Sequence, residues 1–186
     1  MNYINSAKIS GLVHFTGRKK EHSYFPFSIK HENLWTDGIT RRDFVDVRAF
    51  KPELQEKLKA LDENSPVEVS GILRSSKGSG ELFLDAQEIN TPEKLDTLTN
   101  QVELTGFFHV IKAQNEGITG TGKYTRFAVR QDLDSGSRDF LIVRVYDDEL
   151  KKILETKNDD DPVEVQGTLR SSKGSGVNYV RCTGLK

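Results

Sequence analysis

The stretch PVEVSGILRSSKGSG at Pro66–Gly80 returns later in the chain as PVEVQGTLRSSKGSG at Pro162–Gly176. The two copies lie 96 residues apart. When Arg42–Phe83 is aligned with Arg138–Tyr179, 21 of the 42 pairs are identical. Because an internal repeat shows how many similar units a chain contains, this one predicts two units in 186 residues.

The similarity continues upstream of this block. Tyr24–Lys30 matches Tyr124–Arg130, and Lys8–His14 matches Glu103–His109. The offsets there are 100 and 95, so the lengths differ only between matched segments, where loops belong. We therefore predict a first domain at 1–92, a linker at 93–100 and a second domain at 101–186.

Each half shows the same order of strand and helix patterns. Short apolar or alternating runs indicate strands, and leucines spaced by three and four residues indicate one helix. In the first half we expect strands at 7–15, 24–30, 42–50, from Val67 and at 81–89, with a helix opening at Pro52. In the second half we expect strands at 102–110, 124–130, 138–146, from Val163 and at 177–183, with a helix capped by Asp147. The order strand, strand, strand, helix, strand, strand is that of the OB-fold, so the predicted fold class is all-β, with two tandem five-stranded barrels.

The third strand of each half has two different faces. Val45, Val47 and Ala49 point one way and are predicted to form barrel core. The opposite face carries aromatic and basic side chains, and its repeat equivalents in the second half do the same: Phe44, Arg48 and Phe50 match Phe140, Arg144 and Tyr146. Single-stranded nucleic acid is bound by such a surface, because bases stack on rings and phosphates pair with cations.

Neighbouring segments are expected to extend this surface. The second strands add Tyr24 and Lys30, and Tyr124 and Arg130, while the hairpins add Arg74 and Lys77, and Arg170 and Lys173. Trp35, in a polar loop of the first half, has no counterpart in the second. A lone Trp in such a loop is poorly explained by packing, so we count it as a candidate base-stacking residue.

Other interpretations of these residues stay open. An outward Phe can be covered by a loop or a partner subunit, and a strand arginine can be an ordinary solvated charge. The net charge of −1 does not by itself indicate a nucleic-acid partner. Acidic residues gather between Asp147 and Glu164, which leaves room for a basic groove elsewhere.

Signals of an enzyme are weak. The four histidines have no metal-ligand spacing, and the single Cys182 offers neither a disulfide nor a metal cluster. The SSKGSG hairpin lacks the length and ending of a phosphate-binding P-loop. We therefore expect no catalysis, no cofactor and no metal. With no long apolar run and no signal-peptide core, a cytoplasmic protein without a membrane segment is expected.

The segments Phe44–Phe50 and Pro66–Arg74, with the leucine-rich helix between them, resemble the third strand, helix and fourth strand of bacterial single-stranded DNA-binding proteins. In that family, rings at both ends of the third strand and a tryptophan in the preceding loop stack on bases. The resemblance assigns these roles to Phe44, Phe50, Trp35 and, by repeat, Phe140 and Tyr146.

The resemblance implies binding of single-stranded DNA with little sequence preference. Most members carry one OB-fold and assemble four, so a chain with two implies a homodimer. Single-stranded RNA would fit the same platform. A scaffold whose aromatic faces bury another protein is the alternative from a different class.

Overall fold

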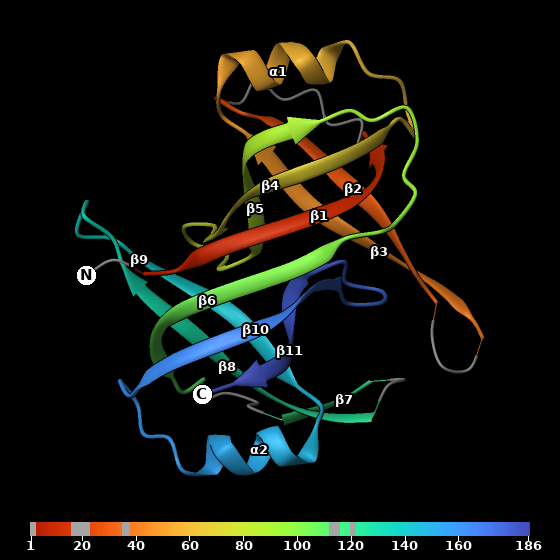
Figure 1. Cartoon of the computed structure of the whole chain (residues 1–186). Helices are drawn as coiled ribbons and strands as arrows, with labels where there is room; N and C mark the ends of the chain where they lie inside the picture. The colour runs from red at the N-terminus through yellow and green to blue at the C-terminus, as the bar shows by residue number, and fades with distance from the viewer. Residues whose placement is uncertain (1–2, 16–22, 35–37, 112–115, 120–121) are drawn as a thin grey trace.

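The structure, a computed structural model, describes residues 3–15, 23–34, 38–111, 116–119 and 122–186. Within these residues the chain forms eleven strands and two helices (Figure 1). In the first half they are β1 Asn5–His14, β2 Phe25–Leu34, β3 Thr40–Ala49, α1 Pro52–Lys59, β4 Pro66–Ser75 and β5 Leu82–Asn90. In the second half they are β6 Asn100–His109, β7 Glu116–Thr119, β8 Gly122–Asp132, β9 Arg138–Val145, α2 Asp148–Glu155, β10 Pro162–Ser171 and β11 Asn178–Leu185.

Each half closes a five-stranded barrel. In the first, β1 pairs with β2, β2 with β3, β3 with β5, β5 with β4, and β4 again with β1. The second half repeats the circuit as β6, β8, β9, β11 and β10. In both, the pair that joins the third and fifth strands is parallel and the others are antiparallel. The predicted fold class, two OB-fold barrels with one short helix each, is confirmed.

The barrel interiors follow the predicted alternation. Val45, Val47 and Ala49 of β3 are at most 1% exposed, as are their equivalents Leu141, Val143 and Val145 of β9. Phe27 and Phe127 fill the two barrels from the second strands. Since successive strand residues point to opposite faces, the intervening side chains of β3 and β9 must point away from the core.

A glycine lets the first strand of each barrel pass from one neighbour to the next. β1 pairs with β4 up to Leu12 and with β2 from Leu12 onward, so it bends at the barrel corner. A Cβ on Gly11 would lie 2.4 Å from the carbonyl oxygen of Lys30, and one on Gly106 would lie 2.5 Å from that of Arg130. Only glycine permits so close an approach of two backbones.

The helices begin where the sequence predicted. Pro52 occupies the first turn of α1, and the Asp147 carboxylate accepts hydrogen bonds from the Glu149 and Leu150 backbone N–H groups at the start of α2. Leu54 and Leu58 of α1, and Leu154 of α2, are buried against the barrels. In the described residues neither helix is long and apolar enough to cross a membrane.

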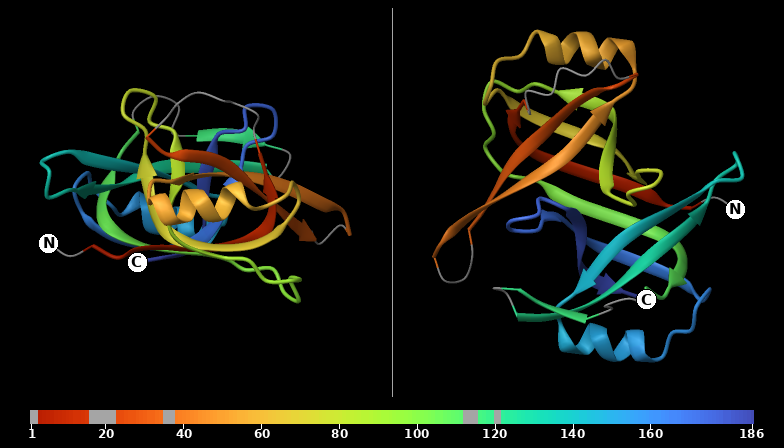
Figure 2. Two further views of the ribbon diagram at one scale, coloured as in Figure 1. Left: turned by 90° about the horizontal axis from the view of Figure 1, so that it is seen from above. Right: turned by 180° about the vertical axis from the view of Figure 1, so that it is seen from behind.

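The two barrels share a strand edge. β1 and β6 pair antiparallel, from Asn5 opposite Leu104 to Ile9 opposite Asn100. This pairing produces a continuous sheet in the order β5-β4-β1-β6-β10-β11, of which β4, β1, β6 and β10 face the viewer in Figure 1. The helices lie at opposite ends of the molecule, and β2–β3 and β8–β9 lie together on the rear side (Figure 2).

The hairpin of each half also contacts the third strand of the other half. Arg74 Nε lies 2.7 Å from Asp139 Oδ2, and Arg170 Nε lies 2.7 Å from Asp43 Oδ2. Both carboxylates are only 4% exposed. The right-hand view of Figure 2 shows the β10–β11 turn beside β2 and β3. The two halves are thus joined reciprocally as well as edge to edge.

Serines beside these arginines complete the junction. The backbone N–H of Ser75 donates to Asp139, and that of Ser171 donates to Asp43. In turn the Ser75 hydroxyl accepts the Phe140 N–H, and the Ser171 hydroxyl accepts the Phe44 N–H. Donors of β9 and β3 that the barrel ladder leaves unused are therefore satisfied by the opposite half.

One element differs from the sequence prediction. We expected no strand between 110 and 124, but Glu116–Thr119 forms β7 and pairs with the start of β8. β8 accordingly begins at Gly122, whose φ of +103° suits a tight turn, rather than at Tyr124. Gly117 and Gly122 therefore lie within the two strands of a hairpin.

Candidate nucleic-acid interface

The outward sides of the second, third and fifth strands form one continuous surface on each barrel. We call the outward side of β2, β3 and β5 the first face and that of β8, β9 and β11 the second face. On the first face Lys30 lies opposite Phe44 and Pro26 opposite Arg48. On the second face Arg130 lies opposite Phe140 and Arg126 opposite Arg144.

Rings and one arginine form a stack across the first face. The Phe50 and Tyr24 rings lie 5.2 Å apart between centroids. The Arg48 guanidinium lies 5.0 Å from the Tyr24 ring centroid and 3.8 Å from that of Phe83. It also donates to the Ser76 hydroxyl at 2.7 Å. Arg48 is therefore held in place by rings and one hydrogen bond, while Phe50 stays 40% exposed.

The second face repeats this stack. Tyr146 and Tyr124 lie 5.5 Å apart between ring centroids. Arg144 lies 4.7 Å from the Tyr124 centroid and 3.9 Å from that of Tyr179. Burial, and then the neighbouring Tyr146 hydroxyl, raise the pKa of Tyr179 above its usual range, so this ring stays neutral beneath the arginine.

The far end of each face carries a phenylalanine beside a histidine. Phe44, 38% exposed, lies 5.3 Å from the His14 ring, and Phe140 lies 4.9 Å from the His109 ring. The His14 Nδ1 lies 2.7 Å from Glu63. The backbone N–H of Phe15, and then His14, lower the pKa of the Glu63 carboxyl.

The second pair is built in the same way. His109 Nδ1 lies 3.2 Å from Asp159. The backbone N–H of Val110 is the main cause that lowers the pKa of the Asp159 carboxyl. His14 and His109 are equivalent in the repeat, and the structure places each of them against a predicted stacking ring.

A groove of about 540 Å³ runs along the first face. Its walls include His14, Tyr24, Phe44 and Arg48 from the first half, and 175–178 from the β10–β11 hairpin of the second half. The Asn178 side chain anchors that hairpin, because it accepts the Asp46 N–H at 2.6 Å and donates to the Phe44 carbonyl at 3.1 Å. The second half therefore completes the groove of the first.

Several predicted phosphate ligands are engaged within the protein. Arg74 and Arg170 form the ion pairs between the halves, and the Arg170 side chain is only 12% exposed. Arg130, 16% exposed, pairs with Asp132 and Asp160 and covers the Phe107 ring.

Lysines in the predicted set have more exposed positions. Lys30 donates to the Asn64 side chain at 2.8 Å. Lys77 and Lys173 are exposed in the two hairpin turns. Trp35 lies outside the described residues.

The site residues predicted from the sequence lack Arg126 of β8 and three members of the two faces from the fifth strands. Phe83, Tyr179 and Arg181 come from the fifth strands, which supply the floor of both stacks. Leu84 and Val180, which alternate with them, are fully buried. The same alternation rule that was applied to the third strands would have identified these residues.

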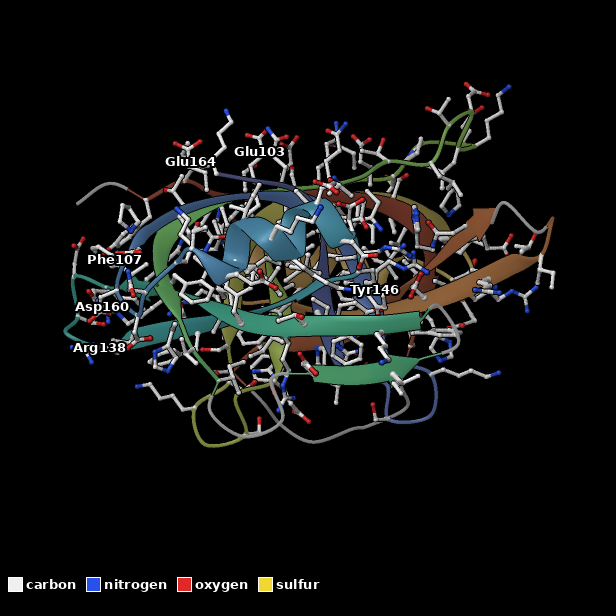
Figure 3. The ribbon with its side chains drawn as sticks, turned by 90° about the horizontal axis from the view of Figure 1, so that it is seen from below. Glu103, Phe107, Arg138, Tyr146, Asp160 and Glu164 are labelled. Carbon is white, nitrogen blue, oxygen red and sulfur yellow. The ribbon has the colours of Figure 1, made fainter. Side chains whose placement is uncertain are left out.

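The opposite side of the molecule has a different character. Glu103 and Glu164 project from β6 and β10, on the side away from β8 (Figure 3). Nearby, Lys8 forms an ion pair with Glu68. Rings and arginines thus gather on the rear side, whereas Glu103 and Glu164 project from the outer side of the shared sheet.

Among the described residues there is no group of three or more His, Cys, Asp or Glu side chains that could hold a metal ion. Cys182 is buried in β11 and its thiol hydrogen-bonds to the Gly184 carbonyl.

No known family model matches this chain, and no curated protein matches its sequence. Solved structures do match its fold. Wild-type single-stranded DNA-binding protein from Thermus aquaticus aligns with a TM-score of 0.74 and 16% identity, over 100% of this chain and 93% of that one. A deletion mutant of the same protein aligns with a TM-score of 0.75 and 17% identity, over 99% and 94% of the two chains. At this level of identity the similarity establishes the shared fold.

Proposed function

We propose that this chain binds single-stranded DNA with little sequence specificity, as a tandem two-barrel version of the bacterial single-stranded DNA-binding proteins, and without catalysis. The observation that carries the proposal is the repeated stack of rings on an arginine, Tyr24–Arg48–Phe83 and Tyr124–Arg144–Tyr179. Beside it lie exposed rings on the first face and half-buried rings on the second. Bases of any sequence stack on such rings, since every base has a π face.

The proposed ring contacts are Phe44, Phe50 and Tyr24 on the first face and Phe140, Tyr146 and Tyr124 on the second. The proposed cationic contacts are Arg48, Arg144, Lys30, Lys77 and Lys173. Trp35 stays in the set on the strength of the family resemblance. We leave out Arg74, Arg130 and Arg170, because carboxylates already neutralise them.

The similarity to the Thermus aquaticus protein supports the proposal through the fold. The expected homodimer stays a prediction, which light scattering of the free chain would measure. The domain limits 1–92, 93–100 and 101–186 are kept as proposed divisions of the chain.

Fluorescence anisotropy of a labelled oligo-dT strand tests the function. We expect binding at low salt, competition by unlabelled single strands of any sequence and little competition by duplex DNA. An RNA competitor of equal sequence decides between the two polymers. Quenching of Trp35 emission on titration would support stacking. A chain that binds no single strand at low salt would overturn the proposal.

A matched variant controls for charge. Lys94 lies in the exposed linker, where it pairs with Asp96, and it belongs to neither face. Lys94→Gln should bind as the wild type does. Arg48→Gln and Arg144→Gln should each weaken binding and flatten its salt dependence, by about 0.7 in the log–log slope for each phosphate that the variant no longer neutralises.

A further inference from the structure

Three arginines stand side by side across the second face. In the strand register, Arg126 of β8 lies opposite Arg144 of β9, and Arg181 of β11 lies beside Arg144 on the other side. Neighbouring strands are about 4.8 Å apart, so the three guanidinium groups can reach one anion. Like charges in directly opposite positions are unfavourable, and an anion bound among them removes that repulsion.

We call Arg126, Arg144 and Arg181 the arginine row. Tyrosine rings contact two of its members. Arg144 lies over Tyr124 and Tyr179, and Arg181 lies 4.9 Å from the Tyr146 ring centroid. A guanidinium stacked on a ring has its N–H groups in its own plane, pointing outward past the edge of the ring. There they can donate in pairs to phosphate oxygens. Arginine is better suited to this geometry than lysine, which has no planar fork.

The first face keeps the rings but not the arginine row. Tyr24 and Phe83 contact Arg48 as their equivalents contact Arg144. The register neighbours of Arg48, however, are Pro26 and Asp85. Arg126 in place of Pro26 makes the second face more positive than the first by one charge. Arg181 in place of Asp85 makes it more positive by two further charges.

Charges around the arginine row also make the second face more positive than the first. Ile142 of the second face occupies the position of Asp46 in the first. Asp147 lines a small pocket with Arg181, but its carboxylate also accepts the two N–H groups that begin α2. The second face therefore carries an excess of cations on a base-stacking platform.

We propose that Arg126, Arg144 and Arg181 form a phosphate site for the strand backbone, and that the second face supplies most of the electrostatic binding while the first binds mainly by stacking. This inference rests on the proposed function. The two barrels share a fold and a set of rings, but by this inference they differ in how they bind the strand.

Neutralisation at equivalent positions tests the inference in the full-length chain. Affinity for oligo-dT is measured by anisotropy over a range of KCl concentrations. Arg181→Gln and Arg126→Gln should each weaken binding about ten- to a hundredfold at low salt, as expected when a hydrogen bond to a charged group is removed. Each should also flatten the log–log salt slope by about 0.7. Asp85→Asn, at the first-face equivalent of Arg181, should strengthen binding.

Three further experiments distinguish an effect of the arginine charge from an effect of its packing. Arg181→Lys keeps the charge and should keep the salt slope while part of the affinity disappears. On an oligo-dT strand with uncharged methylphosphonate linkages, Arg181→Gln should bind as the wild type does. Thermal unfolding of each variant identifies one that fails to fold, in which case Arg181→Lys and Asp85→Asn decide.

The outcomes are distinct. If the wild type binds oligo-dT while Arg126→Gln and Arg181→Gln leave both affinity and slope unchanged, the inference is wrong and the proposed function stands. If Arg181→Gln weakens binding to the uncharged strand equally, the row does not act on phosphate, and the inference is again wrong. If the wild type binds no single strand, both proposals fail.

Discussion

Asp43 and Asp139 each accept an arginine and a serine from the opposite half of the molecule. Both carboxylates are almost fully covered, so removal of the charge leaves a buried guanidinium without its counter-ion. We predict that Asp43→Asn lowers the free energy of unfolding by about 3–5 kcal/mol, the usual effect of breaking a buried pair. Urea denaturation followed by circular dichroism measures it.

Asp96 offers the matched control. It pairs with Lys94, but both side chains are more than three-quarters exposed. Asp96→Asn should therefore change the free energy of unfolding by less than about 1 kcal/mol. Equal effects of the two substitutions would show that the pair between the halves contributes no more than an exposed one.

Phe44 lies in β3 and Phe140 in β9, each beside a histidine ring. Phe44 is 38% exposed, so its truncation leaves no cavity in the barrel core. We predict that Phe44→Ala and Phe140→Ala each weaken binding of a long oligo-dT strand by about 1–3 kcal/mol, the range for removal of one base stack. A large drop in thermal midpoint with unchanged affinity would instead identify these rings as packing residues.

The reactivity of the Cys182 thiol measures how readily β11 opens. Burial raises the pKa of its thiol to about 11, so at pH 8 only about one molecule in a thousand carries the reactive thiolate. Iodoacetamide should therefore label the folded protein very slowly at pH 8 and the urea-unfolded protein quickly. Mass spectrometry of labelled samples checks this, and rapid labelling of the folded chain would mean that β11 opens readily.

The first strand of each barrel depends on one glycine. At Gly106 an added Cβ would meet the Arg130 carbonyl oxygen, a backbone atom that cannot rotate away. We predict that Gly106→Ala destabilises the protein by about 3 kcal/mol, the upper part of the range for overpacking.

Gly184 in β11 serves as the comparison. There the nearest atom to an added Cβ is the flexible Gln166 Oε1, at 3.2 Å. Gly184→Ala should cost less than about 1 kcal/mol, because the side chain can move and alanine restricts the unfolded chain. Thermal unfolding of both variants makes the test, and equal midpoints would contradict the corner role of Gly106.

Local patterns predicted the elements of each barrel but not how the barrels meet. Alternation identified the buried side of β3, and Asp147 identified the start of α2, because both signals depend on neighbours in sequence. The pairing of β1 with β6 is encoded in no local pattern, since any strand edge offers the same backbone groups.

The same limit affects the candidate site. Arg74 and Arg170 carry the features of exposed hairpin cations, and only the junction between the halves brings Asp139 and Asp43 to them. The arginine row was missed for another reason. Arg126, Arg144 and Arg181 are far apart in sequence and become neighbours only through the register of three strands.

At the scale of the whole molecule, the second half provides one wall of the groove on the first face, through residues 175–178. The edge pairing and the reciprocal ion pairs should make the two barrels unfold together. Tests of tandem binding are therefore made on the full-length chain with one face altered at a time. Phe44→Ala with Phe50→Ala removes rings from the first face, and Phe140→Ala with Tyr146→Ala removes them from the second.

Two faces on one chain should make affinity depend on strand length. One OB barrel covers about 4–16 nucleotides, so a strand of about 8 reaches one face and a strand of about 30 can reach both. Once one face is occupied, the other face meets the strand at an effective concentration of order millimolar, and the long strand should bind roughly 10²–10⁴ times more tightly than the short one.

Because the second face is the more positive, the short strand should occupy it first. The first-face variant should then keep the wild-type affinity for the short strand but show no gain on the long one, whereas the second-face variant should already be weak on the short strand. A wild-type affinity that is flat with length would exclude binding by both faces at once, and a short strand that is weakened equally by both variants would contradict the order of occupation.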